Sequence, residues 1–441
     1  MKISEIIKLD LIPRRKLEEA LKWFSDNKLI LITGSRQVGK TSLLYLLIKE
    51  IFEKDKGGIF YYDLEDFQIL ELLNSGVESF IKFLKSKGAD LNKRVYVFLD
   101  EIQYLENPSN FLKLLVDHYK NIKIIASGSS TLDIKRKFKD SLVGRKVVFE
   151  LNTLSFSEYL LFKKRNDLLN IINNCQIRNV IDSKTLKIEK ILPIHQEELF
   201  NEFMEYINYG GYPAVVKEID ISKKIELINE IYTTYVRKDI GQLFSIKDIA
   251  AFNNLVKMIS LQVGNLMNEH NLSTDLKINH ATLKRYLFIL ENTFIIKIIS
   301  PYFKNKHKEI IKMPKVYFLD SGLRNSSIKS FNSFDLRPDL GSLIENYVFC
   351  MINGVLKTSE ELKFWRTKAG SEVDFIIELS EVIPVESKFQ EMSHANIPSG
   401  LRAFIHNYNP KIALVVTKNY YGKTKKDSTV VYFIPVWAIG E

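Results

Sequence analysis

The sequence predicts an α/β fold with parallel sheets, on the basis of three observations. In the N-terminal third, short apolar runs alternate with helical stretches, as in parallel strands joined by helices. One of these runs, Leu29–Thr33, leads through a glycine-bounded loop into an apolar helix. A second set of strands and helices follows a helical middle region, from about residue 301 onward. We therefore expect α/β units towards both ends of the chain, with helices between them.

Composition and charge narrow the class of protein. The 441 residues are 46% hydrophobic and 26% charged, which is typical of a globular chain of about two to four domains. Cys175 and Cys350 lack the spacing of a disulfide or zinc framework, so a reducing compartment is expected. The net charge of +10 permits nucleic-acid binding. Without a signal-peptide core or an apolar membrane span, we expect a cytoplasmic protein and no membrane partner.

The first strand leads into a loop with phosphate-binding chemistry. Residues 1–28 are predicted to be helical, and the eight residues after Thr33 match G-x-x-x-x-G-K-[ST] at every fixed position. The glycines let the backbone wrap closely around a phosphate, and the following helix presents its positive end to it. Lys40 would contact the β- and γ-phosphates, and the Thr41 hydroxyl would bind Mg²⁺. The predicted nucleotide-binding residues are Gly34, Ser35, Arg36, Gln37, Val38, Gly39, Lys40, Thr41 and Ser42.

A second nucleotide signature ends a later strand. A strand at 59–64 and a helix at about 67–87 precede the continuous apolar run 94–99, which is typical of a parallel strand buried on both faces. The run ends in Asp100 and Glu101. Asp100 would hold Mg²⁺ directly or through water, and Glu101 would orient and polarise the attacking water. ATP and Mg²⁺ are therefore the predicted cofactors.

Two further positions in this region leave alternatives open. A helix at 111–119 precedes a strand with a polar end, where Ser127 or Ser129 could act as a sensor of the γ-phosphate or the water. Ser129 and its neighbours could equally cap the next helix. Arg145 precedes the strand 147–151 and could act on the nucleotide of a neighbouring copy in a homo-oligomer, or could be a surface arginine. Ser127 and Arg145 are candidate catalytic residues.

Helices are predicted for residues 153–240. Ser155 and Glu158 have the spacing of a capping box, in which each side chain satisfies a backbone N–H of the other residue. The polar stretch 173–190 is expected to be an exposed insertion, and Gly210–Pro213 a sharp break. We predict that this region is a helical lid or connector.

Residues 241–305 are predicted to be a winged helix-turn-helix. The expected elements are a helix at 255–263, a short helix at 272–276, a turn at 277–279, a longer helix at 280–290 and a strand at 294–299. The longer helix carries the candidate DNA-contacting residues His280, Thr282, Lys284 and Arg285. A helix-turn-helix used only for packing is the alternative.

The last part of the chain carries acids in a pattern that suits metal-assisted hydrolysis. Asp374 lies on one predicted strand, and Glu386 and Lys388 lie two residues apart on the next, so that they share a face. Glu345 on the preceding helix could join them. Carboxylates that hold Mg²⁺ beside a lysine suit phosphodiester cleavage. Glu345, Asp374 and Glu386 are candidate metal ligands, Glu386 and Lys388 are candidate catalytic residues, and exposed charges on an edge strand are the alternative.

Over nearly its whole length, the sequence resembles a family of bacterial and archaeal AAA+-type ATPases. In this family the ATPase is fused to a winged helix and to a fold similar to the PD-(D/E)xK nucleases. The shared motifs are the phosphate loop with Arg36 and Gln37, and then 99–103, 127–130, 142–145, 154–156, 210–213, 237–240, 314–322, 341–346, 372–375 and 384–388. Val373 and Ser387 depart from the family pattern without removing a ligand.

The resemblance implies a domain order and two functional alternatives. The expected domains are a P-loop ATPase core at 1–152, a helical lid or connector at 153–240, a winged helix at 241–305 and a restriction-endonuclease-like α/β domain at 306–441. In one alternative, ATP binding and hydrolysis are coupled to DNA binding, with Mg²⁺-dependent DNA cleavage at the C-terminal site. In the other, ATP switches the binding of DNA or of a protein partner, and the nuclease-like domain is an inactive scaffold.

Overall fold

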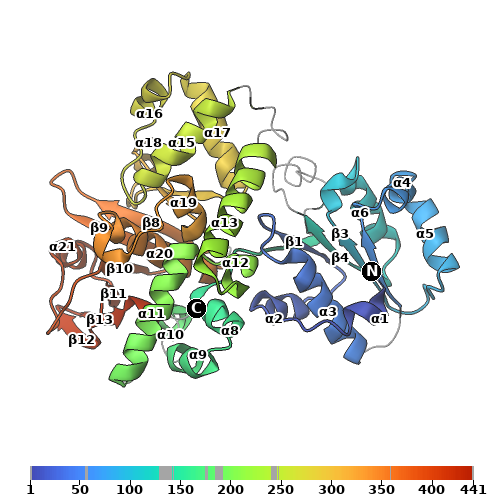
Figure 1. Ribbon diagram of the computed structural model, residues 1–441, viewed down its shortest axis with the longest axis horizontal. Coiled ribbons are helices and arrows are strands. Elements are labelled where there is room, and N and C mark those ends of the chain that lie inside the picture. The colour runs from blue at the N-terminus through green and yellow to red at the C-terminus, as the bar shows by residue number, and fades with distance from the viewer. Residues whose placement is uncertain are drawn as a thin grey trace. The chain divides into compact units, whose positions relative to one another are not determined.

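The computed structural model divides the chain into two units (Figure 1). Unit 1 comprises Met1–Asn152 with Asn292–Phe294, and unit 2 comprises Thr153–Glu291 with Ile295–Glu441. The structure describes residues 2–54, 58–128, 142, 144–173, 177–183, 192–239, 246, 248–357 and 359–439. Ser129 lies outside these ranges. The finer division into four domains stays a prediction.

Unit 1 is built on a five-stranded parallel sheet in the order β2-β3-β4-β1-β5. The strands are β1 (Leu29–Thr33), β2 (Ile59–Asp63), β3 (Val95–Asp100), β4 (Ile122–Gly128) and β5 (Lys146–Glu150). β1 and β4 are buried along their whole length, as expected for central parallel strands. Because β4 lies between β1 and β3, its carboxyl end lies between the phosphate loop and the acid pair.

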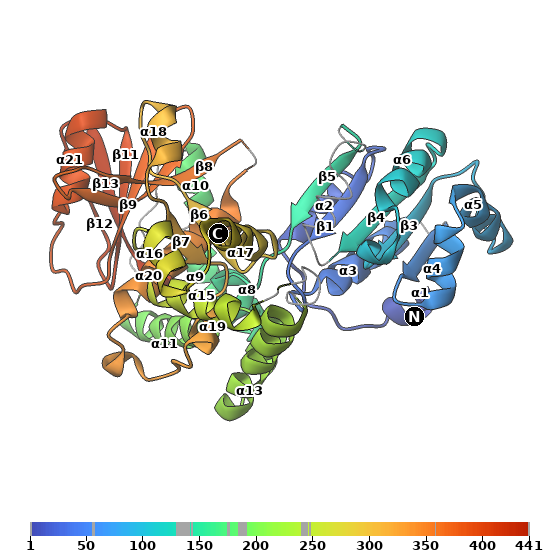
Figure 2. The ribbon, with the colours of Figure 1, turned by 90° about the horizontal axis from the view of Figure 1, so that it is seen from above.

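Helices cover the sheet of unit 1 (Figure 2). Apolar side chains of α4 (Phe67–Asn74), α5 (Val77–Ser86) and α6 (Pro108–His118) pack with Leu29 and Leu31 in one cluster. Since successive residues of a strand face opposite ways, Ile30 and Ile32 face the other side of the sheet. α3 (Lys40–Lys54) begins directly at the phosphate loop and packs against β3 and β4. The predicted α/β architecture is therefore present in this unit.

Two helical predictions in unit 1 were wrong in detail. The described residues 2–28 hold only the short helices α1 (Ile3–Ile6) and α2 (Lys16–Leu21). Between them stands Pro13, which disfavours helical geometry in the residue before it. The single helix expected at about 67–87 is divided into α4 and α5. Gly76 takes a φ of +108° there, which side-chain-bearing residues rarely adopt.

Unit 2 begins with a helical region. Its helices are α8 (Phe156–Phe162), α9 (Asn166–Ile172), α10 (Ile177–Ser183), α11 (Pro193–Tyr209), α12 (Pro213–Lys217), α13 (Ile221–Ile231) and a π-helical stretch, Tyr232–Asp239. The capping box is confirmed, with Ser155 N–H donating to Glu158 Oε2 at 3.2 Å and Glu158 N–H donating to Ser155 Oγ at 3.3 Å. The expected exposed insertion is wrong at α10, because its apolar residues Ile177, Val180 and Ile181 are buried.

A three-helix segment with a two-stranded sheet follows. It contains α15 (Ile249–Leu261), α16 (Glu269–Asp275), α17 (His280–Asn292), β6 (Ile296–Ile299) and β7 (Lys315–Phe318). β6 and β7 are antiparallel, and Leu266 adds a bridge to Lys315. The order of helices, turn and first strand agrees with the elements expected from the sequence.

The connection between β6 and β7 is attached to the C-terminal sheet. It contains α18 (Lys306–Ile311), and Pro301 bridges to Phe364 on the sheet's edge strand. Tyr302 N–H donates to Phe364 O at 2.5 Å. In addition, the buried ammonium of Lys363, the residue before Phe364, lies 2.7 Å from Glu309 Oε2 of α18. Backbone pairing and buried charge therefore hold this connection in place.

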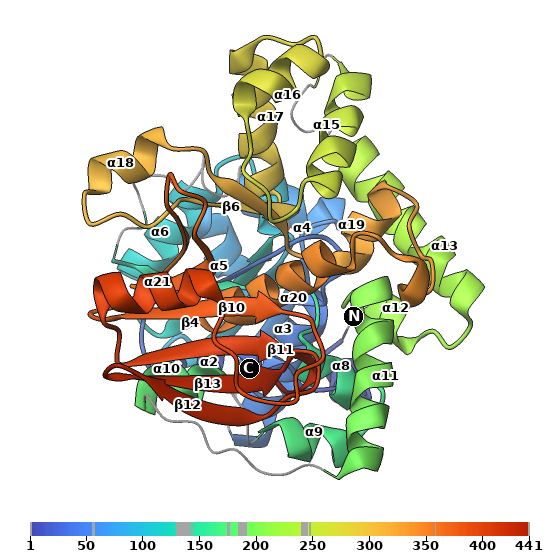
Figure 3. The same cartoon turned by 90° about the vertical axis from the view of Figure 1, so that its left-hand side faces the viewer.

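The C-terminal part of unit 2 is a six-stranded mixed sheet in the order β12-β13-β11-β10-β9-β8 (Figure 3). Its strands are β8 (Glu361–Arg366), β9 (Glu372–Glu378), β10 (Val382–Lys388), β11 (Ile412–Thr417), β12 (Gly422–Lys426) and β13 (Thr429–Pro435). α21 (Ser399–Tyr408) packs on the face that carries Val373 and Ile376. α20 (Leu340–Val355) covers the other face, where Phe349 lies against Phe375.

Two of the shared motifs contact each other: Gly210-Gly211 and Asp320-Ser321-Gly322. Asp320 caps α19 (Ser321–Ser327), and its Oδ2 accepts a hydrogen bond from Gly211 N–H at 2.8 Å. Gly210 has a φ of +79°, and a Cβ there would lie 2.3 Å from Asp320 Oδ1. The glycine is therefore required by this packing, and the structure gives both motifs an architectural role.

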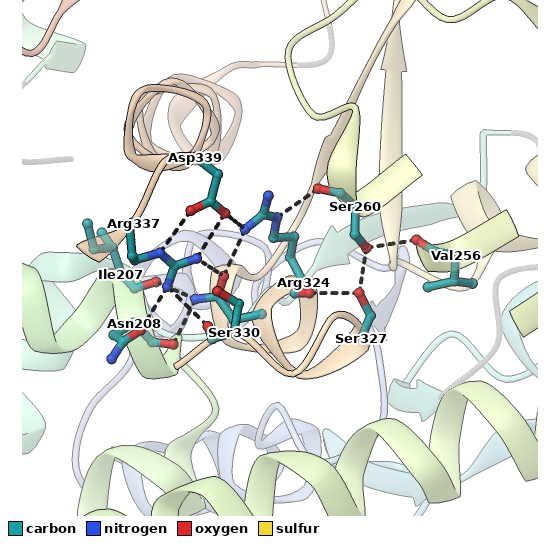
Figure 4. A network of polar contacts seen from close by, with 10 residues as sticks. Ile207, Asn208, Val256, Ser260, Arg324, Ser327, Ser330, Arg337 and Asp339 are labelled. Carbon is teal, nitrogen blue, oxygen red and sulfur yellow. Dashed lines mark hydrogen bonds and ion pairs between the residues drawn. The ribbon is translucent and has the colours of Figure 1, made fainter. Parts of the chain in front are cut away.

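A buried ion network joins α19 to its neighbours (Figure 4). Arg324 and Arg337, whose side chains are 1% and 0% exposed, share the carboxylate of Asp339. Arg324 Nε also donates to Ser260 O of α15 at 2.9 Å, and Arg337 Nη1 donates to Asn208 Oδ1 of α11 at 3.0 Å. Asp339 directly precedes α20, so one carboxylate connects elements from three parts of unit 2.

Candidate nucleotide site and C-terminal acidic cluster

The phosphate loop between β1 and α3 is closed by Lys40. Its ammonium donates to Gly34 O at 3.3 Å and to Ser35 O at 2.9 Å, and the residue is only 5% exposed. Gln37 and Gly39 have φ values of +63° and +95°, so the backbone turns sharply on both sides of Val38. Lys40 and the start of α3 therefore gather positive charge at the position predicted for phosphates.

Gly34 is fixed by packing as well as by phosphate chemistry. A Cβ at this position would lie 2.2 Å from the carbonyl oxygen of Leu151, just after β5. Any side chain would therefore push the start of the loop away from β5.

Arg14 supports the loop, although nothing in its spacing marks it in the sequence. Its Nη1 donates to Val38 O at 2.7 Å, and its Nη2 donates to Asn152 O at 2.9 Å. The residue is 5% exposed and stands 24 positions before the carbonyl that it binds. A contact over this separation depends on the folded structure and leaves no local pattern.

Asp100, at the end of β3, is held by three donors. Its Oδ2 accepts from Tyr61 OH at 3.1 Å, and its Oδ1 accepts from Glu101 N–H at 3.2 Å and from the Ser127 hydroxyl. Burial lowers the pKa of Lys40, while the charges of Glu101 and Asp100 act to raise it. The acid pair is therefore close enough to the loop ammonium for the two to interact.

Glu101 has an unusual backbone conformation that positions its carboxylate. Its φ of +54° is rare for a residue with a side chain, and its N–H also donates to Ser127 Oγ at 3.3 Å. The Gln103 side-chain amide donates to Glu101 Oε2. Tyr61 and Gln103 thus belong to the site. Gln103 stands in one of the shared sequence motifs, whereas no motif marks Tyr61 as a site residue. A γ-phosphate contact by the buried Ser127 stays a prediction.

Arg145 forms an ion pair within unit 1. Its Nε lies 2.7 Å from Asp117 Oδ1 of α6, and its side chain is 39% exposed. The contact suits a surface ion pair, which was one of the two alternatives. Action on a neighbouring copy stays a prediction.

The four candidate DNA-contacting residues lie at and near the start of α17. His280, Lys284 and Arg285 are exposed, and Thr282 is half-buried. His280 Nε2 lies 3.3 Å from Glu269 Oε2 of α16. Towards the interior, α17 buries Leu283, Tyr286, Leu287 and Leu290. Lys284 and Arg285 therefore lie on an exposed face of a helix that is anchored on its other side.

The C-terminal acids converge as their spacing predicts. Lys388 Nζ lies 3.0 Å from Glu386 Oε1, and Asp374 N–H donates to Glu386 Oε2 at 3.3 Å. Ser387 N–H donates to Asp374 Oδ2 at 2.7 Å. A β-bulge in β9 places an extra residue between the pairs Lys363–Ile376 and Trp365–Val373. Bulges of this kind redirect side chains, and this one includes Asp374.

Lys315 and Tyr317 of β7 are members of the cluster that sequence analysis missed. Lys315 Nζ lies 3.2 Å from Glu345 Oε1 and 2.5 Å from Glu372 Oε1, and its side chain is 2% exposed. Tyr317 OH donates to Glu345 Oε1 at 2.6 Å. We define the acidic cluster as Glu345, Glu372, Asp374 and Glu386 with Lys315, Tyr317 and Lys388.

Burial and mutual repulsion shift the acids of the cluster. Burial, and then the charge of Asp374, raises the pKa of Glu386 to about 8 and that of Glu345 to about 7. Burial also raises the pKa of Asp374. For Lys315, burial acts to lower the pKa, but the carboxylates of Glu345, Asp374 and Glu372 outweigh it and raise the pKa above its usual value.

The Mg²⁺ site predicted at Glu345, Asp374 and Glu386 stays a prediction, and two of its three carboxylates are in contact with lysines. In the part of the chain that the structure describes, no group of three or more His, Cys, Asp or Glu side chains is placed to hold a metal ion. The positive charges that act on these acids include the ammonium groups of Lys315 and Lys388. The sequence did not reveal Lys315 because the cluster forms between distant segments.

The nucleotide site, in contrast, suits Mg²⁺ and ATP. Thr41 and Asp100 supply the oxygen donors that Mg²⁺ prefers, and Lys40 with the α3 N-terminus supplies positive charge for phosphates. With the parallel sheet of unit 1, these features are those of a P-loop nucleotide-binding domain.

Comparisons of the sequence with known families agree with this class. Residues 26–160 match the model of an AAA domain. Residues 200–333 match a domain of unknown function, DUF8612, and residues 340–439 match another, DUF4143. Among the described residues, no helix is both long enough and apolar enough to cross a membrane.

Similar proteins occur in bacteria and archaea. An uncharacterized protein of Haemophilus influenzae is 25% identical over 97% of this chain and 99% of its own length. One of Methanocaldococcus jannaschii is 26% identical over 93% and 88%, respectively. Among solved structures, Cdc6p from Pyrobaculum aerophilum (TM-score 0.28, 11% identity) covers 74% of this chain and 97% of its own. DnaA bound to AMPPCP and single-stranded DNA (TM-score 0.29, 15% identity) covers 66% and 91%. TM-scores this low support no conclusion about this chain.

The Gln103 contact leads to a prediction about hydrolysis. Replacing Gln103 with leucine removes the amide that holds the Glu101 carboxylate, while the phosphate loop is left intact. Because a hydrogen bond to a charged group is worth about 1.5–3 kcal/mol, kcat for ATP hydrolysis should fall about tenfold or more with little change in KM. Steady-state phosphate release measures both constants.

The matched control for this variant is Gln68→Leu, since Gln68 is an exposed residue of α4. It should hydrolyse ATP like the wild type. A Gln103→Leu protein with normal kcat and raised KM would show that Gln103 acts on nucleotide binding instead.

Proposed function

We propose that this chain is an ATPase that couples its nucleotide state to DNA binding through α17. The single observation that carries the DNA assignment is the exposed face with Lys284 and Arg285 on an otherwise anchored second helix of a helix-turn-helix. Positive side chains on such a helix suit phosphate and base-edge contacts in a major groove. The net charge of +10 favours the same partner.

The local geometry around α17 supports a winged helix over residues 241–305. Lys277, in the turn between α16 and α17, has a φ of +55°. Asn279 Oδ1 then accepts from Thr282 N–H at 2.7 Å and caps α17. β6 lies inside this range and pairs with β7 just beyond it, and together they supply the antiparallel pair that a winged helix needs after its second helix.

In this proposal DNA contact belongs to α17 and not to the wing. The connection between β6 and β7 would form the wing, but Tyr302 pairs with Phe364, and Lys306 Nζ lies 2.5 Å from Glu378 Oε1 of β9. Both contacts direct this segment to the sheet. A wing held in this way is not available to a minor groove.

We further infer that residues 306–441 form a nuclease-like fold that serves as a scaffold. Support comes from neighbouring antiparallel strands that carry Asp374 and Glu386, with Lys388 two residues later, and from helices on both faces of the sheet. Because lysines fill the cation positions of the cluster, we propose DNA binding without cleavage. The helical region 153–240 would act as the lid or connector.

The test combines a nucleotide trap with variants of α17. The Glu101→Gln protein should bind ATP without hydrolysing it, and fluorescence anisotropy then compares its affinity for duplex DNA with ATP, with ADP and without nucleotide. We expect the affinity to differ between the ATP and ADP states. In the same background, replacing both Lys284 and Arg285 with alanine should weaken binding about tenfold or more and reduce the salt slope by about two.

Lys423→Ala is the control for charge, because Lys423 is an exposed lysine on β12. It should bind DNA like its parent. Undetectable binding to single-stranded or duplex DNA at low salt would contradict the DNA assignment and favour a protein partner. Equal affinity in all nucleotide states would contradict the coupling.

A further inference from the structure

The acidic cluster already contains a buried cation. Lys315 Nζ contacts the carboxylates of Glu345 and Glu372 at 3.2 Å and 2.5 Å, and only 2% of its side chain is exposed. Its charge also acts on Asp374. The ammonium therefore contacts Glu345, one of the three carboxylates that a nuclease-like fold would use for a divalent ion, and acts electrostatically on a second, Asp374.

The position of Lys315 is built into the fold. β7 pairs with β6, so that Lys315 lies opposite Ile299, and Leu266 adds a bridge to the same residue. Tyr317, two residues along the strand, donates to the same oxygen of Glu345 at 2.6 Å. Gly264 leaves room for this carboxylate, because a Cβ there would lie 2.9 Å from Glu345 Oε1.

A divalent ion and the Lys315 ammonium cannot share this position favourably. Mg²⁺ requires about six oxygen ligands at close to 2.1 Å, whereas here oxygens of Glu345 and Glu372 are taken by an ammonium. A divalent ion bound to the same carboxylates would repel the Lys315 ammonium strongly, because little water screens charges at a buried position. Lys388, whose side chain is 43% exposed, lies 3.0 Å from Glu386 Oε1.

We propose that Lys315 is the resident cation of the acidic cluster and excludes divalent metal ions from it. The proposal rests on the nuclease-like fold proposed above and concerns the regulation of that site. β7 pairs with β6, the strand that follows α17, so the residue that closes the cluster lies on a strand pair directly after the helix proposed to bind DNA. The cluster accepts a divalent ion only when Lys315 is removed.

Mn²⁺ binding to the full-length protein, without nucleotide, tests this proposal. Isothermal titration calorimetry and the loss of the free Mn²⁺ electron paramagnetic resonance signal both report binding. In the wild type, no Mn²⁺ binding should depend on Glu386, so Glu386→Gln should give the same isotherm. Lys315→Met should gain one site per chain, at least about tenfold tighter than any wild-type binding, and Lys315→Met with Glu386→Gln should lose it.

Lys315→Arg keeps the charge and should bind Mn²⁺ like the wild type. A folded Lys315→Met protein that gains no site would overturn the proposal. If Lys315→Met does not fold, the wild type and Glu386→Gln decide: identical isotherms support exclusion, and a site lost in Glu386→Gln overturns it. The Lys284 and Arg285 variants test DNA binding separately, so the two proposals can fail independently.

Discussion

Replacing Lys40 with alanine should lower kcat/KM for ATP hydrolysis by at least about a hundredfold. The ammonium is the buried positive charge at the start of α3, and the phosphates of ATP would take the place of the two carbonyl oxygens it now binds. Removing a preorganised charge that stabilises developing negative charge costs about 10²–10³ in rate. Coupled-enzyme assays of hydrolysis and equilibrium binding of a fluorescent ATP analogue measure the two parts of this loss.

Lys54→Ala is the matched control, because Lys54 ends the same helix and its side chain is 70% exposed. Its activity should equal that of the wild type. Turnover by Lys40→Ala at the wild-type rate would show that the phosphate loop is not the site of hydrolysis.

The second large effect is on stability. Asp339→Asn removes the only negative charge drawn in the network of Figure 4 and leaves Arg324 and Arg337 buried without a counter-charge. Among the described residues, Asp339 is the acid that both arginines pair with, and breaking a buried ion pair in this way costs about 3–5 kcal/mol. We expect the denaturant-induced unfolding transition of unit 2, followed by circular dichroism, to shift to lower denaturant by a corresponding amount.

Asp427→Asn, at an exposed turn after β12, is the control and should change stability by no more than about 0.5 kcal/mol.

Lowering the pH should destabilise the wild type in the same way as Asp339→Asn does. Although burial acts to raise it, hydrogen bonds from Arg337 and Arg324 lower the pKa of Asp339 to about 2. A depressed folded-state pKa means that the stabilisation is present above about pH 4 and is lost as the pH falls towards 2. An acid transition unchanged in Asp339→Asn would contradict this assignment.

Local chemistry explains which parts of the nucleotide site could be predicted from sequence. Gly34, Lys40 and Asp100 lie in short motifs whose spacing follows directly from strand, loop and helix geometry. Arg14 and Tyr61 escaped notice because they reach the site from other elements. Their contacts with Val38 and Asp100 exist only after the sheet has formed.

The acidic cluster shows the same limit more strongly. The two-residue period of a strand was enough to place Glu386 beside Lys388. Neither the bulge at Asp374 nor the approach of Lys315 has a periodic signal. For this reason the sequence suggested a metal site, whereas in the folded chain Lys315 contacts Glu345 and Lys388 contacts Glu386.

The attached connection between β6 and β7 has an evolutionary consequence. The strand pair spans the predicted domain boundary at residues 305 and 306, so cutting there would separate β6 from β7 and expose an unpaired apolar edge. Because such a cut is unfavourable, we expect the helix-turn-helix and the C-terminal sheet to be kept together as one evolutionary unit. Shuffling of either part into another protein would have to carry residues 296–318 along with both.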